Sequence, residues 1–320
     1  MGITLYACQT TGGPGVIQPQ TQQKPLTRTY GLLILVILFW GVNWPIMKLG
    51  LGYVTPLWFA TTRMFLGSLS LFFFLALQGR NIIPGRHDIP ILLIIAVFQI
   101  FVPTSLIHSG LLFMEPGRSS ILVFTIPLWV APMAVFVLGE RLSWRKIAGL
   151  LAGLGGIGVL FAPEVFDFND TNALIGNAFM IISSFSFALA IILVRRHSWS
   201  TPVIRLLPWQ MMLGTVFLAV AASTIEGAAD IEWSPPLVAI MAYNGPIASG
   251  FAFWAYVTVS RNLPAMSTAL GSLGIPVMGI IASNLILGEA FSVSIVLGLT
   301  LVSLGVLAVS LDDLKKSKNT

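Results

Sequence analysis

Residues 127–143 read P-L-W-V-A-P-M-A-V-F-V-L-G-E-R-L-S, and residues 276–292 read P-V-M-G-I-I-A-S-N-L-I-L-G-E-A-F-S. The two segments align without a gap at an offset of 149 residues, and the Gly-rich apolar runs that follow them keep the same offset. Apolar sequences rarely match by chance at proline, glycine, glutamate and serine in one register, as these do at Pro127 and Pro276, Gly139 and Gly288, Glu140 and Glu289, and Ser143 and Ser292. The chain is therefore interpreted as an internal duplication.

The composition places this duplication in a membrane. Of the 320 residues, 56% are hydrophobic and only 9% are charged, whereas a soluble domain carries roughly 25% charged residues. The net charge of +5 comes from basic residues in short loops between apolar runs, a pattern that does not indicate nucleic-acid binding. Cys8 is the only cysteine in the sequence, so there is no disulfide framework and no cysteine-based metal site. We expect neither a cofactor nor a metal.

The apolar runs predict ten membrane-spanning helices, because one span needs about 20 mostly apolar residues. The predicted spans are residues 30–50, 56–77, 89–111, 118–138 and 144–161 in the first copy, and 173–194, 202–222, 235–257, 265–287 and 293–311 in the second. Five spans per copy is an odd number, so the second copy must enter the bilayer the other way up. The predicted fold is all-α, a polytopic membrane protein in which two inverted five-helix repeats surround a central cavity.

These spans divide the chain into four parts: a disordered cytosolic N-terminal tail (1–29), a first repeat (30–161), a second repeat (173–311) and a cytosolic C-terminal tail (312–320). Basic residues in the connections predict the orientation. With the N-terminus inside, the outer loops contain Arg118 as their only basic residue. Every other basic residue in a loop falls on the inside. This bias predicts that both termini are cytosolic, in a multi-pass protein of the plasma (or inner) membrane.

Two further motifs accompany the duplicated P-x(11)-G-E-x-x-S block. They are F-W-G-V-N-W-P-I-M-K at residues 39–48, in the first span, and P-L-W-F-A-T-T-R at residues 56–63, in the second. Together the motifs resemble the EamA type of the drug/metabolite transporter superfamily, and the resemblance covers roughly residues 30–311. It implies two five-helix EamA repeats around a central cavity that moves small metabolites or drugs, often outward. It implies no particular substrate, because the substrates of the family are diverse.

We therefore predict a carrier that moves a small metabolite, amino acid or drug-like solute across the plasma membrane by alternating access, in the direction of efflux. Its partners would be a small-molecule substrate and the lipid bilayer, with no nucleic acid, and one chain would act as a monomer. A nucleotide-sugar or sugar-phosphate antiporter of the same superfamily is an alternative, but phosphate binding favours several inward cations and only Lys48 and Arg63 qualify. An integral-membrane enzyme is a weaker alternative, because the three histidines are scattered.

The candidate substrate-binding residues are polar, aromatic or helix-breaking residues inside the spans, where polar groups are costly unless they face protein or water. They are Trp40, Asn43, Trp44, Arg63, Gln99, His108 and Pro127 in the first copy, and Ser183, Tyr243, Asn244, Trp254, Tyr256, Ser272 and Pro276 in the second. Trp209 and Gln210, early in the seventh span, are candidate gate residues at the inner mouth. No residue is predicted to be catalytic.

Structural roles compete with binding at each of these positions. Arg63 lies about 10 Å from the outer end of its span, where it would attract a carboxylate or, alternatively, brace the carbonyls of a broken helix. The run Y-N-G-P at residues 243–246 predicts unwound backbone that lines a cavity. Gln99 and His108 would serve equally well in hydrogen bonds between helices, Pro127 and Pro276 as hinges, and Ser183 in a bond to its own helix. Glu140 and Glu289 are predicted to cap the helices that follow them.

The placement of the acidic residues bears on energy coupling. All twelve fall in loops or at the ends of the predicted spans. A proton-coupled carrier usually keeps a carboxylate in mid-membrane. Facilitated diffusion or exchange is therefore predicted, with His108 as the remaining candidate proton carrier.

Overall fold

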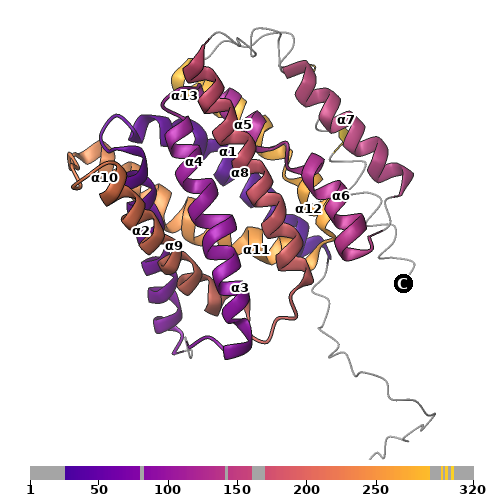
Figure 1. The fold of residues 1–320 in the computed structure, drawn as a ribbon, viewed down its shortest axis with the longest axis horizontal. Coiled ribbons are helices and arrows are strands. Elements are labelled where there is room, and N and C mark those ends of the chain that lie inside the picture. The colour runs from indigo at the N-terminus through magenta and orange to yellow at the C-terminus, as the bar shows by residue number, and fades with distance from the viewer. Residues whose placement is uncertain are drawn as a thin grey trace, which may run out of the picture.

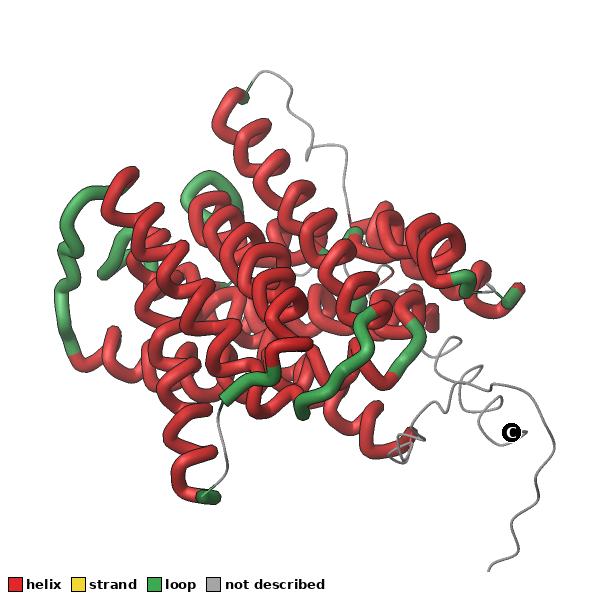
Figure 2. The backbone as a smooth tube through the Cα atoms, turned by 60° about the horizontal axis from the view of Figure 1, so that its bottom comes forward, coloured by secondary structure: helices red, strands yellow, loops and turns green. Residues whose placement is uncertain are grey.

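The computed structural model describes residues 26–79, 83–140, 143–160, 170–288, 297, 300–301 and 304–305. Helices form nearly all of this part of the chain, which contains one isolated β-bridge, between Val54 and Ile231, and no strand (Figures 1 and 2). The elements are α1 (Leu26–Gly50), α2 (Pro56–Leu77), η1 (Arg86–Asp88), α3 (Ile89–Ile94), η2 (Ile95–Phe101), α4 (Val102–Gly110), α5 (Pro116–Val123), α6 (Ile126–Leu138), α7 (Trp144–Leu160), α8 (Thr171–Arg196), α9 (Val203–Ile225), α10 (Pro235–Ala242), η4 (Tyr243–Phe251), α11 (Ala252–Asn262), α12 (Ala265–Gly271) and α13 (Gly274–Leu287).

Within the described residues, eight helical stretches are long and apolar enough to cross a membrane. They are Thr27–Gly50, Pro56–Leu77, Arg86–Gly110, Pro116–Leu138, Thr171–Arg196, Val203–Ile225, Pro235–Asn262 and Ala265–Leu287. The predicted fifth span corresponds to the shorter helix α7, and the predicted tenth span lies almost wholly outside the described residues. Large apolar side chains such as Phe73, Phe136 and Leu285 are exposed, as a lipid-facing surface requires. The prediction of an all-α polytopic membrane protein is confirmed.

The duplicated block ends α6 and α13 in the same way. Gly139 and Gly288 follow these helices with φ angles of 65° and 73°, a left-handed conformation that glycine adopts without steric cost. The predicted cap at Glu140 has a different partner, because its Oε1 accepts a hydrogen bond from the backbone N–H of Ala265 at 2.7 Å. Glu140 therefore caps α12 in the other copy rather than the helix that follows it. Glu289 lies outside the described residues.

The membrane-spanning stretches Pro116–Leu138 and Ala265–Leu287 are interrupted at equivalent places. Helix α5 ends before Phe124, α6 begins at Ile126, and Pro127 lies in the first turn of α6. Helices α12 and α13 meet in the same manner, with Pro276 in the first turn of α13. Proline is tolerated in the first turn of a helix because that position lacks an intrahelical hydrogen-bond partner for its N–H. The two prolines thus mark the interruptions that the sequence predicted.

The stretches Arg86–Gly110 and Pro235–Asn262 each contain a π-helical segment, η2 and η4 respectively, again at equivalent places. The predicted unwound backbone at residues 243–246 is therefore wrong in form: the span stays helical and its turns widen. Each segment also offers a carbonyl to the other copy. Trp40 Nε1 in α1 donates to Ala248 O at 2.8 Å, and Ser186 Oγ in α8 donates to Phe98 O at 2.7 Å.

The two copies interlock rather than lying side by side. Helix α2 packs along α9 and η4, and α9 packs in turn along η2 (Figure 1). Helix α1 packs against α11 and α13, as α8 packs against α4 and α6. Helices α2 and α9 are antiparallel, because Glu226 after α9 accepts from Leu57 N at the start of α2, while Ser68 Oγ farther along α2 donates to Pro208 O early in α9.

Candidate functional site

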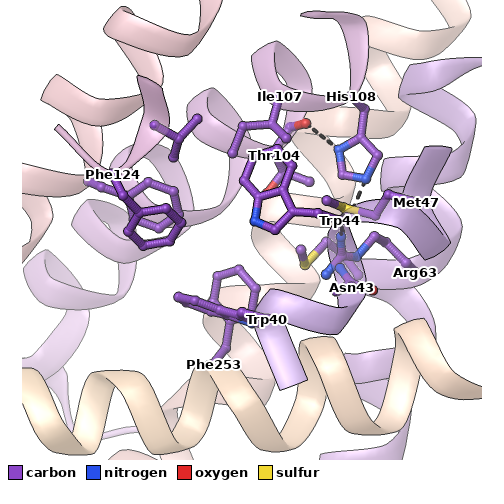
Figure 3. A pocket seen from close by; sticks show the side chains of 13 residues that line it. Trp40, Asn43, Trp44, Met47, Arg63, Thr104, Ile107, His108, Phe124 and Phe253 are labelled. Atoms are coloured by element: carbon purple, nitrogen blue, oxygen red, sulfur yellow. Dashed lines mark hydrogen bonds between the residues drawn. The ribbon is translucent and has the colours of Figure 1, made fainter. Parts of the chain in front are cut away.

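A pocket lies among helices of both copies. It is lined by Trp40, Asn43, Trp44, Met47, Arg63, Met64, Thr104, Ile107, His108, Val123, Phe124, Phe187 and Phe253. The empty space between these side chains is about 450 Å³, counting the part open to solvent. Figure 3 shows Arg63 and His108 on one side of the pocket and Phe124 on the opposite side, with Trp44 between them. The pocket is thus polar at one end and aromatic at the other.

Arg63 supplies the charge at the polar end. Its side chain is only 4% exposed, and its partners come from three other segments. Nε donates to Ser249 Oγ at 3.0 Å, and Nη1 lies 2.9 Å from Met47 Sδ and 3.4 Å from His108 Nε2. Among the residues that the structure describes, no carboxylate forms an ion pair with this guanidinium. A buried cation with neutral partners is costly, and an anion in the pocket would offset that cost.

His108 is held as a neutral imidazole in this arrangement. Its Nδ1 lies 2.6 Å from the carbonyl oxygen of Thr104, which can only accept, so Nδ1 must donate its proton there. Its Nε2 faces the Arg63 guanidinium, which can only donate, so Nε2 must present its lone pair. Adding a second proton would require Arg63 to move away. In this conformation His108 therefore orients Arg63 and does not take up a second proton on Nε2.

The aromatic end is assembled around Trp40. The centroid of its ring lies 5.0 Å from Phe253, 6.2 Å from Phe187 and 4.9 Å from Tyr256. Its indole N–H is fixed by the bond to Ala248 of η4, so the ring is anchored in both copies. Between the two ends, the Oδ1 atom of Asn43 is buried and has no hydrogen-bond partner among the described residues. Such an atom is suited to a ligand that donates a hydrogen bond.

Five of the predicted binding residues meet in this pocket: Trp40, Asn43, Trp44, Arg63 and His108. The other nine (Gln99, Pro127, Ser183, Tyr243, Asn244, Trp254, Tyr256, Ser272 and Pro276) are not among its lining residues. Several of them make structural bonds: Tyr243 OH donates to Phe39 O, Ser183 Oγ to Phe179 O, Asn244 Nδ2 to Ile240 O and Ser272 Oγ to Ala269 O. Tyr256 packs behind Trp40 and Phe187, where it supports the aromatic end.

The two predicted gate residues lie where α9 packs along α2. Trp209 contacts Phe72 of α2 edge-to-face, with ring centroids 5.1 Å apart. Gln210 is fully buried, and neither its amide nitrogen nor its amide oxygen has a partner among the described residues. Their role in gating stays a prediction.

Sequence reasoning missed most of the apolar lining and the partner of Arg63. Phe124, Phe187 and Phe253 look like ordinary core or lipid-facing residues in an apolar span, and nothing in their spacing singles them out. Ser249 gave a weak signal, because it follows the Y-N-G-P run by three residues in η4. Lys48 donates to the carbonyl oxygen of Leu111 at 2.5 Å and so braces the end of α4.

One group of described residues has the ligand types of a metal site. The side-chain ligand atoms of His87, Asp88 and His197 lie within 4.8 Å of one another. Both carboxylate oxygens of Asp88 already accept hydrogen bonds from Ser200, at 2.5 Å from its hydroxyl and 3.2 Å from its backbone N–H. We therefore interpret this group as a hydrogen-bonded clamp between two loops.

Comparisons with known proteins agree with this architecture. The model of the EamA-like transporter family matches residues 27–162 and again residues 174–311. The uncharacterized transporter YoaV of Bacillus subtilis is 27% identical over 86% of this chain and 94% of its own length. A probable amino-acid metabolite efflux pump of Escherichia coli is 26% identical, covering 88% of this chain and 94% of its own. A crystal structure with a TM-score of 0.71 and 18% identity covers 88% of this chain and 96% of its own, and shares the fold.

Proposed function

This chain belongs to the EamA-like transporter family, and on that premise we propose that it exports a small amphipathic carboxylate through the pocket at Arg63. The observation that carries the proposal is the buried guanidinium, which faces the pocket with neutral partners only among the described residues. A carboxylate would supply the missing negative charge and accept charge-assisted N–H bonds from the guanidinium. The aromatic end would take the apolar part of the same solute.

The pocket favours a carboxylate over a phosphate. Arg63 is the one lysine or arginine among the lining residues that the structure describes, and Lys48 is engaged by the carbonyls at the end of α4. A doubly charged phosphate would need more cations than this. The unpartnered Oδ1 of Asn43 would accept a hydrogen bond from an amino or hydroxyl group of the solute. An amino acid or a related metabolite has both features.

The activities named for two relatives support this direction and substrate class. One relative is a probable amino-acid metabolite efflux pump of Escherichia coli. Another, from Streptantibioticus cattleyicolor, is a probable terminal-alkyne amino-acid exporter, 24% identical over 82% of this chain and 87% of its own. We infer efflux across the cell membrane on this basis.

Transport would proceed by alternating access between two inverted repeats of five spans each. The antiparallel packing of α2 with α9, the equivalent interruptions and the equivalent π-helical segments support the inversion. Both termini would then be cytosolic. Because both copies line the pocket, one chain would suffice.

Three buried amides lack full hydrogen bonding among the described residues: those of Gln99, Asn244 and Gln210. These amides would contact the solute in another conformation of the transport cycle.

Vesicles that contain the purified protein test the substrate class. We expect exchange of labelled carboxylates that carry an aromatic or branched apolar part, and no exchange of the corresponding carboxamides, because a carboxamide lacks the charge that Arg63 binds. An imposed pH gradient should not drive accumulation, since His108 is held neutral. The measurement is counterflow into preloaded vesicles, with empty vesicles as the control.

Two results would oppose this proposal. One is equal exchange of the carboxylate and its carboxamide, which would show that the charge of Arg63 is not used. The other is accumulation driven by a pH gradient. If His108→Gln abolishes this accumulation, His108 carries a proton; if the accumulation persists, the proton carrier lies outside the described lining residues of the pocket.

A further inference from the structure

The two ends of the antiparallel α2–α9 pair are held by carboxylates. At one end, Glu226 follows α9 and accepts three hydrogen bonds from the start of α2. The donors are the backbone N–H of Leu57 (2.8 Å to Oε1), the backbone N–H of Trp58 (3.2 Å to Oε2) and the hydroxyl of Thr55 (2.6 Å to Oε2). The indole N–H of Trp58 also donates to Gly227 O at 3.1 Å. This end of α2 is therefore bonded to the second copy.

At the other end, Asp88 follows α2 in the chain, just before α3, and binds the segment that leads into α9. Ser200 donates to it through its hydroxyl and its backbone N–H, and Thr201 adds a side-chain hydrogen bond. His197 Nε2 lies 3.0 Å from the same carboxylate. The Asp88 side chain is fully buried. The start of α9 is thus bonded to the first copy.

The two arrangements are alike but not at equivalent sequence positions, because Glu226 directly follows α9 whereas Asp88 lies between α2 and α3, at the end of η1. Each carboxylate lies in the connection after the second long helix of its own copy. Each one binds the threonine of a Thr-Pro pair that begins the second long helix of the other copy, Thr55-Pro56 at α2 and Thr201-Pro202 at α9. In both arrangements a carboxylate of one copy therefore holds the start of the second long helix of the other copy.

We propose that Glu226 and Asp88 are two latches that hold opposite ends of the α2–α9 pair, and that each one releases in a different half of the transport cycle. The inference rests on the proposed function, because a carrier must open one end at a time. Opening an end would separate the start of one helix from a carboxylate in the other copy. Charge-assisted hydrogen bonds are the stronger kind, so each carboxylate sets how readily its own end opens.

Distances between spin labels at each end test this proposal. In a Cys8→Ser background, labels at Gly52→Cys and Ala229→Cys report on the Glu226 end, and labels at Arg86→Cys and Ser198→Cys report on the Asp88 end. All four positions are exposed. Glu226→Ala should raise the ratio of long to short distances about tenfold in the first pair, and should not raise it in the second pair. Asp88→Ala should give the opposite result. Electron–electron double resonance in lipid nanodiscs measures both ratios.

Milder variants and a control accompany these measurements. Thr55→Val and Thr201→Val each remove one hydrogen-bond donor, so they should change the label distances as Glu226→Ala and Asp88→Ala do, by smaller factors. They replace the alanine variants in the test if an alanine variant does not fold. Glu232→Ala removes an exposed carboxylate near Glu226 and should leave both distance distributions unchanged. The proposal is overturned if folded Glu226 and Asp88 variants shift the same pair, or if neither pair shifts.

The experiments test the latches and the proposed carboxylate site independently. If the label distances do not respond but transport still depends on Arg63, the latches are wrong and the proposed function stands. If the distances respond as expected but carboxylates are not transported, the proposed substrate class is wrong.

Discussion

Replacing Arg63 with glutamine should abolish carboxylate transport while the protein stays folded. The substitution removes the charge that the solute binds, and losing one partner of a buried charged pair costs about 3 kcal/mol, or roughly 100-fold in affinity. Initial rates of counterflow in vesicles measure this loss. Arg63→Lys should restore part of the activity, because it keeps the charge but loses the planar guanidinium and its several N–H donors.

The stability of the same variant separates a binding role from a structural one. In the unliganded protein, Arg63 is a buried cation with neutral partners among the described residues, so neutralising it should leave the melting temperature unchanged or raise it. Adding the solute should stabilise the wild type and not Arg63→Gln, because a ligand stabilises only the state that it binds. Arg196→Gln, at an exposed position at the end of α8, is the matched control and should transport normally. If Arg63→Gln lowers the melting temperature but still binds the solute as the wild type does, Arg63 has a bracing role instead.

Gly245→Ala should destabilise the protein even though it adds one methyl group. Helix α2 approaches η4 so closely that a Cβ atom at Gly245 would lie 2.5 Å from Leu66 Cβ, an atom attached directly to the backbone. The helices must then move apart, and overpacking of this kind costs about 1–3 kcal/mol. Because Arg63 and Ser249 bond across the same contact, the pocket should also lose affinity. Thermal unfolding in detergent, followed by tryptophan fluorescence, measures the first effect.

Gly31→Ala is the control for this experiment. A Cβ atom at Gly31 would have no neighbour within 4 Å, and alanine favours a helix over glycine. The same substitution should therefore be neutral or slightly stabilising in α1. Equal melting temperatures for the two alanine variants would mean that α2 and η4 do not pack as closely as described.

The duplication, the class of fold and the polar end of the pocket follow from the sequence for identifiable reasons. Proline, glycine and glutamate matched in one register, and the structure explains the glycines, since Gly139 and Gly288 both end helices with positive φ. Arg63 and His108 stood out because polar residues are rare and costly within a span. The first-span motif contributed Trp40, Asn43 and Trp44 because it is dense in residues that a lipid-facing helix does not need.

Other parts depend on contacts between copies, which periodicity does not reveal. A Tyr-Asn-Gly-Pro run favours unwinding locally, but the Asn244 side chain bonds to Ile240 O and Trp40 binds the carbonyl of Ala248, so the span remains helical as a π-helix. The carboxylate of Glu140 caps a helix 125 residues away rather than the next one. The aromatic end uses phenylalanines that resemble those facing lipid. In each case the deciding partner is distant in the chain.

The proposed transport depends above all on Arg63 binding the carboxylate of the solute inside the pocket. Calorimetric titration of the purified wild type and Arg63→Gln with one carboxylate and its carboxamide tests this most directly. We expect the wild type to prefer the carboxylate by about 100-fold and Arg63→Gln to bind the two equally. A carboxylate preference of the same size in Arg63→Gln, or none in the wild type, would contradict it.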